Sequence, residues 1–201
     1  MKDREVQVKK KIIRTTFDLL MEYDAEEITT RKIAKAAGVS VSAINYHFQT
    51  KNNLIEIAIR DTIGDIVGMM KELYKSIEGS PYSRLLVAVK ETCNFIAKMP
   101  RVSRISIFSD LMSGYGEDNI KRSSDVLRYI LKEVFNGEEF RQITDSDINI
   151  LIYQIVGAID FAFLRSKQIK AETGLDFFND ADRNYYVVSI LNNLIKIRGV
   201  K

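Results

Sequence analysis

Hydrophobic positions along this chain recur at the spacing of an α-helix. Ile13, Phe17, Leu20 and Met21 stand at i, i+4, i+7 and i+8, which places them on one helical stripe. The two prolines and the singly scattered glycines leave long stretches uninterrupted, and no pair of alternating strand patterns stands out. The sequence therefore predicts an all-α protein of about nine helices. The expected helices are 4–23, 31–37, 41–48, 51–78, 81–98, 101–112, 117–135, 145–171 and 177–197.

Short polar residues and one glycine mark the ends of the first predicted helices. Asp24 is expected to end the first helix, since Asp tolerates the left-handed conformation. Thr29 or Thr30 caps the second helix and Ser40 caps the third. Between them, Gly38 supplies a tight turn with positive φ. Two short helices joined by a glycine turn form a helix-turn-helix, which presents its second helix to the DNA major groove.

The net charge of +3 arises within the first 60 residues. These hold 11 Lys or Arg and 8 Asp or Glu, whereas residues 61–201 hold 19 of each. Residues 28–55 contain four basic side chains and no acidic one. Such a segment is either an electrostatic footprint for a polyanion or a solvated helix face that lacks acids by chance.

The third predicted helix has one apolar and one polar face. Val39, Ile44 and Phe48 turn inward, and the opposite face carries hydrogen-bonding side chains without negative charge. Asn pairs bidentately with adenine, and Tyr and Ser can reach bases or phosphates. The polar face comprises Ser42, Asn45, Tyr46 and Gln49.

The segment around these two helices carries the most specific motif in the chain. It contains Ile-Ala at 33–34, Ala-Gly-Val-Ser at 37–40, Tyr-His-Phe at 46–48 and Thr-Lys-x-x-Leu at 50–54. Over about residues 10–60 the chain resembles the DNA-binding motif of the TetR family of transcriptional regulators. It departs from the family at Asp24 and Ala25, where members usually carry glycine and then an aromatic residue. A second departure is Val41, where a polar or basic residue is common.

The resemblance implies two domains and a set of partners. A helix-turn-helix DNA-binding domain at 1–50 would precede a larger helical domain at 51–201. That second domain would bind an unknown small-molecule effector and form a homodimer through the last two helices. Double-stranded DNA carrying a palindromic operator is the expected nucleic-acid partner.

Transferred position by position, the resemblance also implies eight DNA contacts. Ser42 and Asn45 are expected to read base edges, and Lys51 is expected to make an ionic contact to phosphate. The full set is Thr30, Arg31, Ser40, Ser42, Asn45, Tyr46, His47 and Lys51.

Four of these eight residues have structural explanations as well. Thr30 and Ser40 could each simply cap a helix, which is compatible with a phosphate contact. Tyr46 could be a half-buried aromatic residue, and His47 could pack on the first helix.

The rest of the chain supplies aromatic and methionine residues that either line a ligand pocket or fill the core. Asp160 stands out in an apolar run, because a carboxylate is costly to bury unless it is paired. It could pair with a cationic ligand, hydrogen-bond across a dimer seam, or lie exposed. Gly157 on the same stripe permits close helix approach and favours the seam. The candidate ligand-binding residues are Tyr74, Phe95, Met99, Phe108, Met112, Tyr129, Tyr153, Asp160 and Phe161.

Composition argues against several other classes of protein. A single cysteine, Cys93, and a single histidine, His47, exclude a disulfide framework and argue against Cys- or His-rich metal sites, so no metal or cofactor is expected. The chain lacks a nucleophile elbow and a P-loop, so it is not expected to be an enzyme. No run approaches 18 apolar residues and the start is no signal peptide, so no membrane span and a cytoplasmic location are expected.

Together these features predict a ligand-responsive repressor that binds its operator as a dimer and is released by the effector. An activator or a ligand-independent regulator would carry the same residues and stays open as an alternative. A helical enzyme and a protein-interaction module are more remote alternatives.

Overall fold

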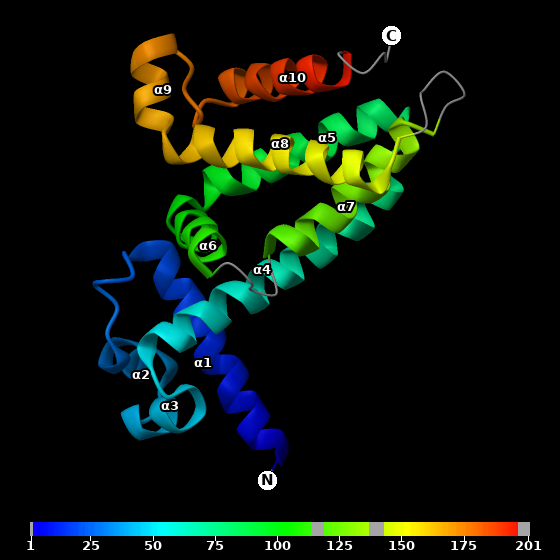
Figure 1. Cartoon of the computed structure of the whole chain (residues 1–201). Helices are drawn as coiled ribbons and strands as arrows, with labels where there is room; N and C mark the ends of the chain where they lie inside the picture. The colour runs from blue at the N-terminus through cyan, green and yellow to red at the C-terminus, as the bar shows by residue number, and fades with distance from the viewer. Residues whose placement is uncertain (1, 114–118, 137–142, 197–201) are drawn as a thin grey trace. The chain divides into compact units, whose positions relative to one another are not determined.

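The computed structural model describes residues 2–113, 119–136 and 143–196, and the regular elements in these ranges are all α-helices (Figure 1). The all-α prediction is therefore confirmed, with ten helices where about nine were expected. The helices are α1 (Lys2–Glu22), α2 (Thr30–Ala37), α3 (Val41–Phe48), α4 (Lys51–Ser76), α5 (Pro81–Lys98), α6 (Pro100–Ser113), α7 (Asn119–Val134), α8 (Asp145–Leu164), α9 (Ser166–Thr173) and α10 (Asp180–Lys196).

The chain divides into two compact units. The first comprises residues 2–68 and 101–113, and the second comprises 69–100 together with the described residues from 119 onward. α4 thus continues from the first unit into the second. α6 belongs to the first unit, although it lies between helices of the second unit in the sequence.

The core of the first unit forms where the apolar stripes of α1 to α4 meet. On α1 the buried side chains are Ile12, Thr16, Phe17 and Leu20, so the stripe is rotated slightly from the predicted one. Ile13 is only half-buried. The Thr16 hydroxyl donates to the Ile12 carbonyl at 2.8 Å, which satisfies this buried polar group within its own helix.

The end of α1 differs from the prediction. The helix ends at Glu22, and Gln49 is the one non-glycine residue with positive φ in the described chain, so Asp24 is not left-handed. Instead, the Asp24 N–H donates to Glu27 Oε2 at 3.1 Å. The Asp24 carboxylate accepts a hydrogen bond from Arg101 Nε of α6 at 2.9 Å. Hydrogen bonds of Asp24 with the side chains of Glu27 and Arg101 therefore take the place of the left-handed conformation that was expected to end α1.

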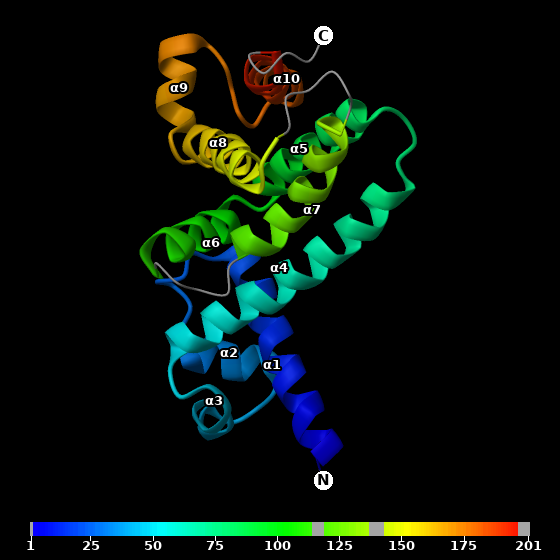
Figure 2. The same cartoon turned by 45° about the vertical axis from the view of Figure 1, so that its right-hand side comes forward.

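The second unit packs α5, α7, α8 and α10 around an aliphatic core (Figure 2). Leu85, Leu131 and Leu191 are fully buried representatives of three of these helices. The buried guanidinium of Arg183 on α10 donates to Asn94 Oδ1 of α5 through Nε at 3.0 Å and Nη2 at 2.8 Å. A buried charge is tolerated there because its donors have partners.

The predicted helix over 145–171 is in fact two helices. At Arg165 the backbone leaves helical geometry (φ −104°, ψ 18°), although its N–H still bonds to the Phe161 carbonyl at 2.9 Å. Phe163 and Ser166 are buried on either side of this break, and the Phe163 and Phe177 rings lie 5.8 Å apart. Packing on residues distant in sequence turns the chain here, where the sequence has neither Gly nor Pro.

By length and composition α8 could cross a membrane, which the expectation of no such stretch overlooked. Its buried side, with Ile148, Leu151 and Ile155, packs inside the second unit as a core helix does.

Candidate nucleic-acid interface

The turn between α2 and α3 is built on Gly38, as predicted. Gly38 is left-handed (φ 64°, ψ 40°). Its N–H donates to the Lys35 carbonyl at 3.3 Å, and the Val39 N–H donates to the Ala34 carbonyl at 3.0 Å. This pairing satisfies carbonyls that the end of α2 would otherwise leave open, and it fixes the direction in which α3 leaves.

Hydroxyl caps start each of the three helices around this turn. Thr29 Oγ1 accepts from the Lys32 N–H, Ser40 Oγ from the Ala43 N–H and Thr50 Oγ1 from the Asn53 N–H, each at 3.1 Å. Thr29, and not Thr30, is therefore the cap of α2. Thr30 is the first residue of that helix and is half-buried. The capping explanation given for Ser40 is confirmed.

α3 has one buried and one exposed side. Ile44 and Phe48 are buried against the first unit. On the other side Ser42 and Asn45 are exposed, and Tyr46 is 77% exposed. In Figure 2 α3 is seen nearly along its axis at the edge of the first unit. The outward side chains thus offer donors and acceptors to a partner while the apolar side holds the helix in place.

The end of α3 is a tight γ-turn that the sequence did not predict. Gln49 adopts φ 63° and ψ −56°, and the Thr50 N–H donates to the Phe48 carbonyl at 2.7 Å. The Asn53 side-chain amide donates to the same carbonyl at 2.8 Å. A side chain at positive φ costs about 1–2 kcal/mol, and such strain is concentrated at functional sites.

Three aromatic rings lie near this end of α3. His47 is half-buried and makes edge-on contacts with Tyr46, at 5.0 Å between ring centres, and with Phe48, at 6.0 Å. His47 therefore supports the exposed Tyr46 ring from one side.

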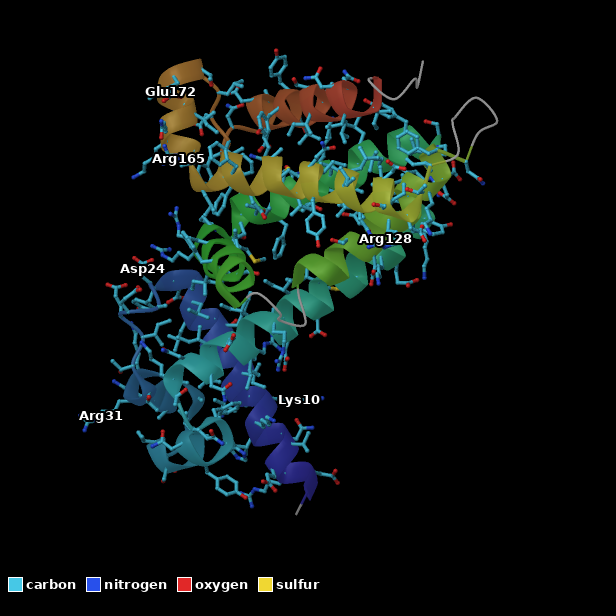
Figure 3. All side chains as sticks on the ribbon, in the orientation of Figure 1. Lys10, Asp24, Arg31, Arg128, Arg165 and Glu172 are labelled. Atoms are coloured by element: carbon cyan, nitrogen blue, oxygen red, sulfur yellow. The ribbon has the colours of Figure 1, made fainter. Side chains whose placement is uncertain are left out.

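The basic candidates differ in how they are held. Arg31 is exposed and projects from α2 away from α1 (Figure 3). Lys51 is half-buried, and its ammonium donates to the Ala25 carbonyl in the α1–α2 loop at 2.9 Å. This bond ties the start of α4 to that loop. An ammonium has three N–H donors, so Lys51 keeps donors for a phosphate oxygen.

The comparisons with known proteins agree with this geometry. Residues 12–58 match the family model described as bacterial regulatory proteins, tetR family. A putative TetR-family transcriptional regulator from Mesorhizobium loti has the same fold over 98% of this chain and 99% of its own, with a TM-score of 0.71 at 16% identity. The helix-turn-helix segment is thus similar to that of the TetR family, and the whole chain has the fold of such a regulator.

Other transcriptional regulators extend the comparison. The HTH-type transcriptional regulator BetI of Klebsiella pneumoniae is 30% identical over 82 residues, 40% of this chain and 42% of that protein. The chain thus spans about two fifths of the length of the curated relatives it matches. The transcriptional regulator FadR from Bacillus subtilis, solved in complex with stearoyl-CoA, aligns over 96% of this chain and 99% of its own, with a TM-score of 0.64 at 18% identity. These proteins are described as transcriptional regulators and not as enzymes.

The nine predicted ligand residues are spread from α4 to α8. Tyr74 is buried, and its hydroxyl donates to the Ala88 carbonyl at 3.1 Å. Burial raises the pKa of Tyr74 to about 12. Phe95, Met99 and Asp160 are half-buried.

The other predicted ligand residues are exposed or undescribed. Phe108 is 49% exposed, Tyr129 57%, Tyr153 71% and Phe161 62%. The side chain of Met112 lies outside the described residues. A ligand-binding role for the nine residues stays a prediction.

The cysteine in the described part of the chain is buried. Burial raises the pKa of the Cys93 thiol to about 12, so the thiol is neutral and shielded. Within the described ranges, no three His, Cys, Asp or Glu side chains are grouped so that they could hold a metal ion.

Proposed function

We propose that this chain is a cytoplasmic transcriptional repressor that binds a palindromic DNA operator as a dimer and releases it when a small-molecule effector binds. The observation that carries the proposal is the exposed polar side of α3, held outward by the buried pair Ile44 and Phe48 and by the Gly38 turn. An α-helix of this kind fits the major groove of B-DNA.

Within this proposal the eight candidate residues divide the work of recognition. Asn45 and Ser42 face outward along α3 and read base edges, since an amide pairs bidentately with adenine. Arg31 and Lys51 bind phosphates and fix the register of α3 in the groove. The others, Thr30, Ser40, Tyr46 and His47, contribute hydrogen bonds to the backbone of the duplex.

The outward face of α8 supports the dimer. Ile150, Tyr153, Gly157 and Phe161 follow one another at spacings of three and four residues, and all four are exposed. Tyr185 of the neighbouring α10 is 65% exposed as well. An apolar stripe of this length marks a protein interface more often than a solvated surface.

The exposed position of Gly157 favours a second copy of this chain as the partner that packs on the α8 stripe. A Cβ added at Gly157 would meet nothing within 4 Å, so the helix surface is open at this point. A symmetric copy could then bring its own α8 close at the glycine, with Tyr153 and Phe161 packing on either side. Such a dimer would present two α3 helices, one for each half-site of a palindromic operator.

The effector part of the proposal draws on the fold. FadR from Bacillus subtilis, which has a similar fold, was solved with stearoyl-CoA, a small molecule. We propose that the second unit of this chain likewise receives a small molecule. Effector and DNA would then oppose each other by a coupling of about 1–3 kcal/mol.

In vitro selection with the full chain tests the DNA part of the proposal. A library of duplexes with a randomised central region is enriched on the immobilised protein and sequenced. We expect an inverted repeat whose half-sites lie about one helical turn apart or a multiple of it. Recovery of the starting sequence distribution after repeated rounds, from a chain with native helix content, would contradict the proposed function.

A further inference from the structure

Part of the positive charge of residues 1–60 lies at the start of α1, outside the helix-turn-helix. Residues 2–14 contain six Lys or Arg and two Asp or Glu, whereas residues 15–60 contain five basic and six acidic side chains. In the described part of the chain, none of the exposed basic side chains between Arg4 and Arg14 is paired with a carboxylate. A net positive segment of this kind attracts phosphate.

This charged segment projects from the packed core. Side chains from Asp3 to Gln7 are all exposed, and Ile12 is the first fully buried residue of α1. The ten residues from Lys2 to Lys11 span roughly 15 Å at the rise of an α-helix. Figures 1 and 2 both show this end of α1 at the same end of the first unit as α3. A duplex in contact with α3 would therefore pass beside α1.

Individual cations of α1 flank the helix-turn-helix. A Cβ added to Gly38 would lie 3.6 Å from Lys11 Nζ, so this ammonium is next to the turn that precedes α3. Lys9 Nζ lies 5.9 Å from the centre of the Phe48 ring, at the last residue of α3. Lys10, between these two lysines, projects from the side of α1 opposite to α2 and α3 (Figure 3).

Arg4 extends the same row. It precedes Lys11 by seven residues, which is two helical turns, so both side chains leave one face of α1 about 10 Å apart along the helix axis. Asp3 and Glu5 occupy the first turn, where carboxylates complement the helix dipole and keep an unpacked segment helical. α1 thus presents two cations from a helix that is formed before any partner arrives.

We propose that Arg4 and Lys11 form a second DNA-contact surface on α1, which binds backbone phosphates beside the groove that α3 enters. This inference rests on the proposed function, because it requires that α3 bind duplex DNA. A guanidinium can grip a phosphate with two parallel hydrogen bonds, and an ammonium acts as a point charge. Contacts to phosphate carry no base information, so this surface adds affinity and orientation but no sequence preference.

The test compares two double variants of equal charge. Arg4→Ala/Lys11→Ala removes the proposed contacts, and Arg165→Ala/Lys167→Ala removes one Arg and one Lys from exposed positions near and on α9 in the second unit. Binding is measured by fluorescence anisotropy against a labelled duplex of about 30 bp, long enough for two half-sites. Both a random sequence and the sequence recovered by in vitro selection are used, over a range of KCl concentrations.

The expected result is a smaller salt dependence for the α1 variant alone. Each lost phosphate contact lowers the slope of log K against log salt by about 0.9, so the slope should fall by about 1.8 per bound chain relative to the α9 control. At about 0.1 M salt this amounts to a roughly ten- to sixtyfold weaker affinity for each bound chain, equal on both duplexes. The charge-conserving variant Arg4→Lys/Lys11→Arg should keep the wild-type slope.

The failures of the two proposals can be told apart. If the wild-type chain prefers the selected duplex and the α1 variant has the same slope as the control, the second contact surface is wrong and the proposed function stands. A wild-type chain that binds neither duplex would overturn both proposals. Equal thermal unfolding of the two double variants shows that a difference in slope does not arise from unfolding.

Discussion

Replacing Gly38 with alanine should destabilise the first unit, because its backbone is left-handed. At φ 64° and ψ 40°, a side chain costs about 1–2 kcal/mol. Space is not the problem, since the added Cβ would only reach ordinary contact distance, 3.6 Å from the flexible Lys11 ammonium. Alanine also reduces the freedom of the unfolded chain, which returns about 0.4–1 kcal/mol. The net expectation is a loss of about 1 kcal/mol.

Gly68→Ala is the matched control for this prediction. Gly68 lies inside α4 with a helical backbone, and an added Cβ would meet nothing within 4 Å. The same substitution should there stabilise the protein by about 0.5–1 kcal/mol, because alanine is the better helix former. The two variants thus differ in the sign of their effect.

Thermal unfolding followed by circular dichroism measures both effects. A change of 1 kcal/mol shifts the Tm of a chain of this size by about 2–4 °C. Gly38→Ala should lower the Tm of the first unit by about that amount, and Gly68→Ala should raise it. A Gly38→Ala variant as stable as wild type would refute the claim that the left-handed backbone at this turn favours glycine.

Three further predictions concern single residues. Lys51→Ala should weaken binding to selected and random duplexes alike and lower the salt slope by about 0.9 per chain. An unchanged slope would mean that Lys51 binds the Ala25 carbonyl and no phosphate. Tyr153→Glu should turn the proposed dimer into a monomer in sedimentation velocity, whereas Met69→Glu, at a comparably exposed position (65%), should not. If both variants are dimeric, the α8 stripe is not the interface. Burial raises the pKa of Cys93 to about 12, so between about pH 9 and 12 only the unfolded thiol ionises and the free energy of unfolding should fall as the pH rises. Cys93→Ala should reduce this fall. An unchanged pH profile of this variant would contradict the prediction.

The sequence predicted the helix-turn-helix well because its determinants are local. Caps at Thr29 and Ser40, the turn at Gly38 and the inward pair Ile44 and Phe48 act within a few residues of one another. Each of these signals can be read without knowing what lies nearby in space.

The features that the sequence did not predict depend on distant partners. The break at Arg165 follows from the packing of Phe163 on Phe177, and no local residue signals it. The γ-turn at Gln49 is a different case, because its partner Asn53 is close in sequence, but no turn residue such as Gly or Asn stands at position 49 to signal the positive φ. Only their residue type predicts Tyr153 and Phe161 as ligand residues, because periodicity assigns a face to a residue but not the partner that covers it.

The most direct test of the central claim is the specificity ratio of Asn45→Ala, defined as its affinity for the selected duplex divided by its affinity for a random duplex. If Asn45 reads a base edge from the outward side of α3, this ratio should fall by about 1–3 kcal/mol, or roughly five- to 150-fold, while random binding stays nearly constant. Gln168→Ala, which removes an exposed amide from α9, should leave the ratio unchanged. Equal losses on both duplexes for Asn45→Ala would contradict base reading by α3.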